Sequence, residues 1–359
     1  MKKLDRYLLH DFLLYSLMGV LLFVGIFVIV DLFEKIDTFV DNKAGFSTVV
    51  RYYAWNVPVL LIQIVPLAVL LGSILSLGQM RRFNELTAMQ GAGISPLRIA
   101  TPLLAAALLI AGFDYGLGEW IVPQAYRQQQ KILRVDIKGQ EPLETAGRMN
   151  IRYLGRGGNL YTIEFFDGAT GSLRNVSVQS LAENGIRRRI DAEAARYRDG
   201  LWRFEKGTLR AFGDSSETTI RFRNYGTSSL PEKPRDFLRP EESLFEMNMR
   251  ELRAYADRIR SSGGRDVKIR VDYQLRVSFP LATVIMVLLG ASLSLRIVRG
   301  GSVALGIGAT VFVGFAYYAM LRAGQALGYN ETVPPIVAAW LGNILFGGLG
   351  SFFFWKVTR

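Results

Sequence analysis

Six long apolar runs, each almost free of charged residues, constrain this chain more than any other feature. They lie at residues 12–30, 57–77, 97–112, 277–295, 303–321 and 333–355. A helix needs about 20 apolar residues to cross a hydrocarbon core of about 30 Å, and each run approaches or exceeds that length. The sequence therefore predicts an α-helical membrane protein with six transmembrane helices, and it excludes a soluble globular enzyme.

The distribution of Lys and Arg in the short loops predicts the orientation, because basic residues beside a span collect on the cytoplasmic side. With the amino terminus inside, ten of them lie in the cytoplasm: Lys2, Lys3, Arg6, Arg81, Arg82, Arg98, Arg296, Arg299, Lys356 and Arg359. Only four fall in the short outer loops: Lys35, Lys43, Arg51 and Arg322. We expect the first run to be a retained span, since Asp31 and Glu34 follow it rather than a small-residue cleavage site. Both termini are thus predicted to be cytoplasmic.

The long middle segment, residues 119–272, differs completely from the apolar runs. It carries 28 Lys and Arg against 22 Asp and Glu, and its apolar residues alternate with polar ones at 159–165, 201–205 and 219–223, as in half-buried strands. We expect an inserted all-β domain of seven or more antiparallel strands outside the membrane, and a short helix at 244–259 leading back. The predicted organisation is 1–118 for spans one to three, 119–272 for the β domain and 273–359 for spans four to six.

Several classes of chemistry are excluded or disfavoured by what the chain lacks. It has no cysteine and one histidine, His10, which argues against Cys or Ser-His-Asp catalysis and against metal sites. No Gly-x-x-x-x-Gly-Lys-Ser/Thr phosphate loop is present. Ionisable residues deep in the predicted spans are almost absent, and Asp114 lies near the outer end of the third span, so an ion-driven mechanism is disfavoured. We expect no catalytic residue, no metal and no cofactor, and an energy source in a partner.

The stretch between the second and third runs, residues 81–93, predicts a short cytoplasmic helix. Phe83, Leu86 and Met89 recur at helical spacing, and residues 91–93 (Gly-Ala-Gly) end the helix. Ser95 then suits the N-cap of the next helix, and Pro96 suits its first position. Two interpretations stay open: an interfacial helix resting on lipid headgroups, or a helix whose glutamate enters a basic pocket on an ATPase.

An ordered set of motifs resembles one family of membrane proteins. Residues 85–93 (ELTAMQGAG) resemble the coupling-helix signature of the LptF/LptG (YjgP/YjgQ) permeases, and residues 4–7 (LDRY) resemble the start of these proteins. Residues 118–124 (GEWIVPQ) resemble the motif that leaves the third span in the LptG type, which favours that type over LptF. Residues 279–281 (FPL) and 333–336 (VPPI) resemble further motifs of the family in type. Together the motifs occur in the family's order over nearly the whole chain.

The resemblance implies a half-permease of the ABC transporter for lipopolysaccharide export in the Gram-negative inner membrane. It implies three partners, namely an LptF-like second permease, an LptB-like ATPase dimer that binds the ATP, and an LptC-like bitopic protein. It also implies that the β domain is a periplasmic β-jellyroll. Glu85 matches the coupling-helix glutamate that contacts the ATPase, and Arg82, Leu86 and Met89 are candidates on the same stretch.

The residues that meet the lipid headgroup are less clearly indicated. Members resembling LptG carry a lysine late in the first span, where ungapped alignment places Asp31 in this chain. A shift of about one helical turn puts Lys35 in that role, with Asp37 beside it, because positions four apart share a helix face. Lys35 as a headgroup anchor of the span is an equal alternative. Arg322 is a weaker candidate for the same anionic head.

The same sequence features bear on several functions other than lipopolysaccharide export by an LptG-type subunit. The paired LptF-type subunit, or an exporter of another envelope lipid, would have nearly the same sequence pattern. A membrane-anchored periplasmic binding or scaffold protein would need only one or two spans, so six spans disfavour it. Nucleic acid is a poor ligand for an outward-facing domain, and the net charge of +6 on residues 119–272 is expected mainly to solvate the sheet.

Overall fold

The structure is a computed structural model that describes residues 3–140, 147–155, 158–182, 185–213, 217–238, 246–261, 266–296 and 303–358. The chain divides into two compact units. One consists of Met1–Ile132 and Val267–Arg359 and is helical; the other runs from Leu133 to Asp266 and contains a β-sheet. Residues 119–132, assigned above to the β domain, therefore pack with the helices, because the helix that they form lies against the second span.

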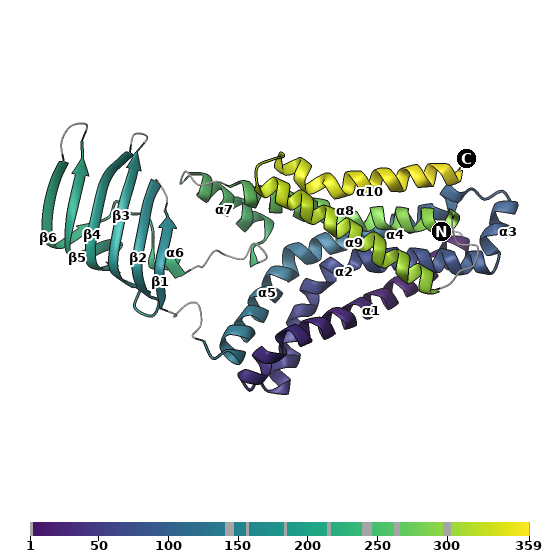
Figure 1. Cartoon of the computed structure of the whole chain (residues 1–359), viewed down its shortest axis with the longest axis horizontal. Coiled ribbons are helices and arrows are strands. Elements are labelled where there is room, and N and C mark those ends of the chain that lie inside the picture. Colours follow the sequence, from purple (N-terminus) through teal and green to yellow (C-terminus); the bar gives the residue numbers. More distant parts are fainter. Residues whose placement is uncertain are drawn as a thin grey trace. The chain divides into compact units, whose positions relative to one another are not determined.

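Among its described residues, the helical unit contains six helices that are long and apolar enough to cross a membrane, in agreement with the predicted six spans (Figure 1). Its elements in chain order are α1 (Lys3–Asp41), α2 (Phe46–Arg82), α3 (Glu85–Gly91), α4 (Pro96–Gly116), η1 (Leu117–Ile121), α5 (Val122–Lys131), η2 (Ile132–Ile137), α8 (Val267–Arg296), α9 (Val303–Tyr329) and α10 (Pro335–Thr358). The segments η1 and η2 are π-helical turns on either side of α5, and the third span continues through them.

The six spans pack around one apolar core supported by satisfied polar contacts. The core combines buried side chains of α1, α2, α4, α8 and α9. Across α8, α9 and α10, the Tyr317 hydroxyl donates to Asn343 Oδ1 at 2.8 Å, and Asn343 Nδ2 donates to the Ser278 carbonyl at 2.6 Å. Hydrogen bonds of this kind stabilise helix contacts in lipid, where apolar burial supplies little drive between helices.

The helix α3 is set off from its neighbours by two backbone breaks. Asn84 has a left-handed conformation at φ 60°, which a short polar side chain tolerates, and it separates α3 from the end of α2. Gly93, at φ 82°, ends the other side, and the Ser95 hydroxyl then accepts a hydrogen bond from the Arg98 amide at 3.3 Å. The predicted glycine stop and serine cap are confirmed, but Arg82 belongs to α2 rather than to the short helix.

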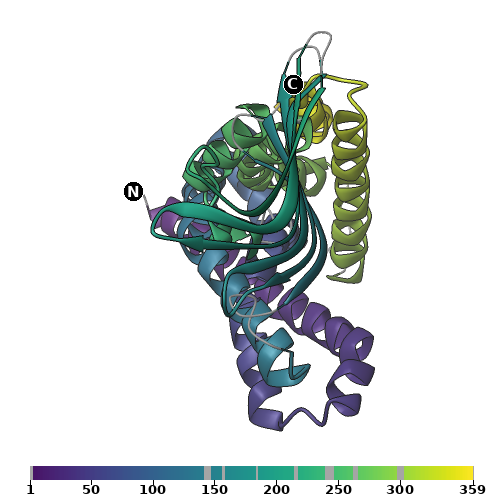
Figure 2. The same cartoon turned by 90° about the vertical axis from the view of Figure 1, so that its left-hand side faces the viewer.

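The β unit contains one six-stranded antiparallel sheet in which each strand pairs with its neighbour in sequence. The strands are β1 (Arg148–Leu154), β2 (Asn159–Asp167), β3 (Ser172–Ala182), β4 (Gly185–Arg198), β5 (Leu201–Phe212) and β6 (Glu217–Thr227). Figure 2 shows that the sheet is strongly curved. The predicted all-β insertion is confirmed. The prediction of seven or more strands is wrong for the described residues, which form six. Arginine-rich stretches such as 187–189 continue a strand, so the strands are longer and fewer.

One face of the sheet carries the core of this unit. Trp202, Tyr161 and Phe204 are each 1% exposed, and Phe237 of the short helix α6 (Pro234–Leu238) packs against Tyr161 at 5.1 Å between ring centres. The Trp202 indole donates to the backbone carbonyl of Glu232 at 2.7 Å. The predicted return helix is α7 (Met249–Ser261), a few residues later than expected; residues 239–245 lie outside the described part.

Candidate functional site

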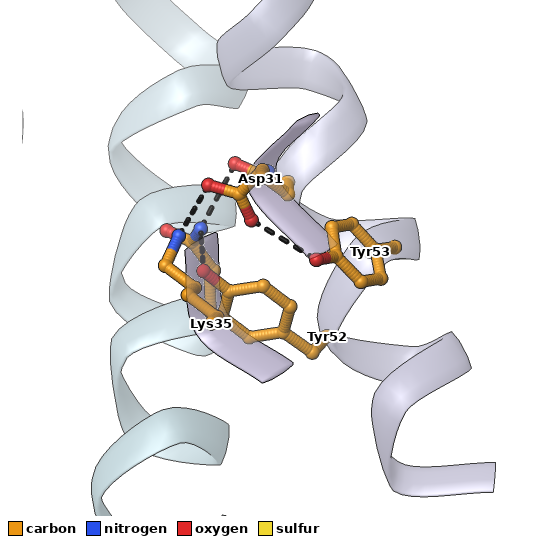
Figure 3. Close-up of polar contacts among 6 residues, drawn as sticks. Asp31, Lys35, Tyr52 and Tyr53 are labelled. Atoms are coloured by element: carbon orange, nitrogen blue, oxygen red, sulfur yellow. Dashed lines mark hydrogen bonds and ion pairs between the residues drawn. The ribbon is translucent and has the colours of Figure 1, made fainter. Parts of the chain in front are cut away.

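Lys35 and Asp31 form an ion pair on α1, near the turn that joins α1 to α2. Tyr53 on α2 donates a hydrogen bond to the second carboxylate oxygen of Asp31, with 3.1 Å between the two oxygens. The Lys35 ammonium also lies 5.3 Å from the centre of the Tyr52 ring, a cation–π distance. Figure 3 shows both tyrosines beside the pair. The Lys35 side chain is 30% exposed, so a ligand can reach it.

The helix α5 supports this cluster from the other side. Gln129 is 5% exposed, and its Nε2 donates to the Tyr52 hydroxyl at 3.0 Å and to Asn56 Oδ1 at 2.9 Å. These bonds join the helix that leaves the third span to α2, and they fix the Tyr52 ring under Lys35. The ammonium of Lys35 therefore contacts groups of α1 and α2, and α5 holds one of these groups in place, which favours a specific site over a flexible anchor.

The two other candidates for the lipid headgroup lie apart from this cluster. Asp37 is exposed on α1. Arg322 is exposed on α9, where its Nη1 donates to Gln325 Oε1 at 2.9 Å. Gln325 in turn donates to Asp272 on α8 at 2.9 Å. Among the described residues, Arg322 and Lys35 therefore belong to two separate polar clusters.

Glu85 is the first residue of α3, which lies at the opposite end of α1 and α2 from the Lys35–Asp31 pair. The Tyr7 hydroxyl on α1 donates to Glu85 Oε2 at 3.0 Å. A carboxylate in the first turn is also favoured by the partial positive charge of the helix amino terminus. Glu85 is half-buried, which leaves part of its side chain open to a partner.

The other residues predicted for ATPase coupling divide between the two faces of this region. Leu86 is 3% exposed and belongs to the main apolar core, and Met89 packs against that core, so these two side chains hold α3 on the bundle. Arg82 is exposed, with its guanidinium 5.9 Å from the ring centre of Phe83. Phe83 itself is 65% exposed. The accessible side of this region therefore includes Arg82, Phe83, Thr87 and Ala88, together with part of Glu85.

Four participants were not identified from the sequence: Tyr7, Tyr52, Tyr53 and Gln129. Tyr7 lies in the LDRY motif, and Gln129 lies five residues after the GEWIVPQ motif. Position in or near a motif was therefore the only feature of the sequence that could have indicated these two residues. Nothing in the sequence indicates that Tyr52 and Tyr53 meet Lys35, because that contact depends on how α1 and α2 pack. Among the described residues, His, Cys, Asp and Glu form no group of three or more that could hold a metal ion.

The fold and these polar clusters define a class of protein. In the described residues, six apolar helices, a β domain inserted between the third and fourth of them, and a short helix between the second and third define a multi-pass membrane protein with an inserted β domain. Residues 6–356 match the family described as "Lipopolysaccharide export system permease LptF/LptG", and the chain belongs to that family.

Relatives within the family are distant in sequence. The lipopolysaccharide export system permease protein LptG of Escherichia coli K12 is 22% identical over 290 residues, which cover 78% of each chain. The protein of the same name from Haemophilus influenzae is 28% identical over 121 residues, or 34% of each chain. The family match confirms the family predicted from the sequence, and together with the six apolar helices it supports a multi-pass location in the inner membrane.

Proposed function

We propose that this chain is the LptG-type half of an ABC exporter that extracts lipopolysaccharide from the outer leaflet of the inner membrane and passes it to a periplasmic β-jellyroll bridge. The family match over residues 6–356 carries the proposal, and the name of the Escherichia coli relative supports the choice of half. An LptF-like permease would supply the second half of the exporter, an LptB-like ATPase dimer would bind ATP, and an LptC-like protein would join the bridge. The chain itself contributes no catalytic residue and no cofactor.

The proposed orientation places both termini and α3 in the cytoplasm and the β unit in the periplasm. The excess of Lys and Arg in the loops on the side of the termini supports it. With this orientation Lys35 lies at the periplasmic end of α1, at the depth of outer-leaflet headgroups. Glu85 lies at the cytoplasmic end, where an ATPase is accessible.

In this proposal Lys35 binds the acidic head of the lipid. The Lys35–Asp31 pair is neutral as a whole, so an incoming phosphate competes with Asp31 for the ammonium. Phosphate carries more negative charge than a carboxylate and offers three acceptor oxygens, which favours the exchange. Tyr53 continues to donate to Asp31 after Lys35 turns to the lipid, so the carboxylate keeps a partner. Arg322 provides a second, exposed contact on α9, and Asp37 provides no positive charge for the head.

Coupling to ATP hydrolysis is assigned to α3. Leu86 and Met89 hold the helix on the bundle, so α3 moves together with the spans. Glu85, Arg82 and Phe83 face outward to the ATPase. A half-buried carboxylate at the start of a helix is suited to a basic pocket on that partner, because charge-assisted hydrogen bonds are the strong ones.

The experiment is purification of the complex with the LptB-like ATPase and the LptF-like permease, followed by reconstitution into lipid bilayers that contain lipopolysaccharide. Glu85→Gln is expected to weaken the affinity for the ATPase about tenfold, as loss of about 1.4 kcal/mol implies, and so to lower the lipid released per ATP hydrolysed. The matched control is Glu34→Gln, an exposed carboxylate on α1 far from α3 along the helix. Equal release by Glu85→Gln and by Glu34→Gln would contradict the coupling role.

The headgroup site has its own test in the same complex. Lys35→Gln is expected to weaken lipopolysaccharide binding about tenfold, because a charge-assisted bond contributes about 1.5 kcal/mol or more. The control is Lys43→Gln, an exposed lysine in the α1–α2 turn. Recovery of a chain with neither an ATPase nor a second permease would refute the exporter itself and favour the scaffold alternative.

A further inference from the structure

The first turns of α1 lie against the start of the coupling helix α3. Tyr7 and Glu85 are 78 residues apart, yet the Tyr7 hydroxyl donates to Glu85 Oε2 at 3.0 Å. A hydroxyl–carboxylate bond is charge-assisted and directional. It therefore restricts the rotamer of Glu85, which would otherwise be free on the exposed side.

This end of α1 is itself firmly held. The Arg98 guanidinium of α4 lies 2.7 Å from the carboxylate of Asp5, and Asp5 is only 8% exposed. One turn further along α1, Leu8 is 1% exposed in the same apolar core as Leu86 of α3. The start of α1, α3 and the start of α4 thus form one packed corner, from which Tyr7 reaches Glu85.

The helix α1 continues without interruption from this corner to the Lys35–Asp31 pair. It spans 39 residues, Lys3–Asp41, with no proline, whereas α2 contains Pro58 and Pro66. At 1.5 Å per residue, Tyr7 and Lys35 are about 42 Å apart along one helix. Because a straight helix drifts by about 20° per heptad, the four heptads between them turn the two side chains about 80° apart around its axis.

Close backbone contact stiffens α1 further. A Cβ added at Gly19 would lie 3.2 Å from the Cα and the carbonyl oxygen of Ala68 on α2, so the two helices approach closely at this point. Small residues at such contacts permit tight packing in membranes. A movement at one end of α1 is therefore transmitted rather than absorbed by bending.

We propose that Tyr7 is a positioning residue for Glu85, and that α1 links the ATPase-binding helix to the lipid-head pair through Tyr7 at one end and Lys35 at the other. This inference rests on the function proposed above and adds a regulation to it. Exchange of Asp31 for a phosphate at Lys35 acts on α1, and Tyr7 transmits the change to the carboxylate that the ATPase meets. The presence of lipid thereby adjusts ATP hydrolysis.

The test measures ATP hydrolysis by the complete complex in bilayer nanodiscs, with and without lipopolysaccharide, and takes the ratio as the lipid stimulation. Tyr7→Phe removes only the hydroxyl. We expect it to lower the stimulation about threefold, the effect of one lost hydrogen bond, while the amount of bound ATPase and the thermal midpoint stay unchanged. Tyr15→Phe, the same substitution two turns along α1, is expected to leave the stimulation at the wild-type value.

A double-mutant cycle separates the hydrogen bond from other effects of the substitution. If Tyr7 acts through Glu85, the double variant Tyr7→Phe/Glu85→Gln shows the same stimulation as Glu85→Gln alone, because contacting residues are not additive. Additive losses would overturn the proposal, as would loss of the ATPase from the Tyr7→Phe complex, since that indicates a purely structural role.

Two further outcomes distinguish this inference from the proposed function. If Glu85→Gln lowers the stimulation and Tyr7→Phe does not, the inference is wrong and the coupling role of Glu85 stands. If Glu85→Gln changes neither ATPase binding nor the stimulation, the coupling role itself is wrong and the inference fails with it.

Discussion

Replacement of Gly72 by alanine tests the packing of α1 on α2, on which the arrangement at both ends of these helices depends. A Cβ built on Gly72 would lie 2.8 Å from the backbone nitrogen and 2.9 Å from the Cα of Ser16, and it would also meet the Ser16 hydroxyl. A hydroxyl can rotate away, but backbone atoms cannot, so the two helices must move apart.

The magnitude follows from two opposing contributions. Overpacking by one methyl group costs about 1–3 kcal/mol. Alanine gains about 0.5–1 kcal/mol over glycine inside a helix. The net expectation for Gly72→Ala is a loss of about 0–2.5 kcal/mol, with a middle value of about 1 kcal/mol, in the free energy of unfolding. Gly78→Ala on the same helix is the matched control, because an added Cβ there has no neighbour within 4 Å. The control should gain about 0.5–1 kcal/mol.

The assay is reversible unfolding of the purified chain in mixed micelles of mild detergent and sodium dodecyl sulfate, followed by far-ultraviolet circular dichroism. The two alanine variants should shift the transition in opposite directions from the wild-type protein. Shifts of the same sign, or a Gly72→Ala variant as stable as Gly78→Ala, would refute the close backbone contact between α1 and α2.

Other perturbations give equally direct expectations. Asn343→Leu should destabilise the helical unit by about 2 kcal/mol, since it leaves the buried Tyr317 hydroxyl without its acceptor and removes the side-chain bond to the Ser278 carbonyl; the same detergent titration checks this. Arg81→Gln should lower the thermal midpoint, because the guanidinium donates to the Ser294 carbonyl at 3.0 Å in the last turn of α8. Burial, together with the hydrogen bond to Glu232, raises the pKa of the Tyr161 phenol above its ordinary value of 10.0. The unfolded chain then ionises first as pH rises, so the β unit should keep its full stability below about pH 10 and lose it progressively above that value. Thermal melts of the wild-type protein from pH 8 to 11 should show this loss, and Tyr161→Phe should show a smaller one.

The orientation of α3 illustrates how far pattern reasoning extends. Helical spacing placed Phe83, Leu86 and Met89 on one face, and Gly91 to Gly93 at its end. The structure buries Leu86 and Met89, but Phe83 is exposed, because the left-handed turn at Asn84 interrupts the helix between Phe83 and Leu86. Periodicity assumes an unbroken helix, and a single φ angle was enough to turn Phe83 to the other side.

The β unit shows a similar limit. Alternation identified strands at 159–165, 201–205 and 219–223, and the insertion between the third and fourth spans followed from composition. Strand length did not, because β4 continues for 14 residues through Arg187 to Arg189. An arginine on the solvent side of a sheet carries no apolar signal, but its backbone pairs as well as any other.

The sequence alone determined the six spans, the position of the β insertion, the serine cap at Ser95 and the membership of the family. These depend on local hydropathy, turn chemistry and ordered motifs, which are properties of consecutive residues. Only the tertiary structure decided that Tyr52 and Tyr53 contact the Lys35–Asp31 pair, that Gln129 supports Tyr52, and that Tyr7 meets Glu85. Those contacts join residues from separate helices. The apolar content of a segment determines whether it spans the membrane, but not the rotation or the depth at which the helix packs against its neighbours.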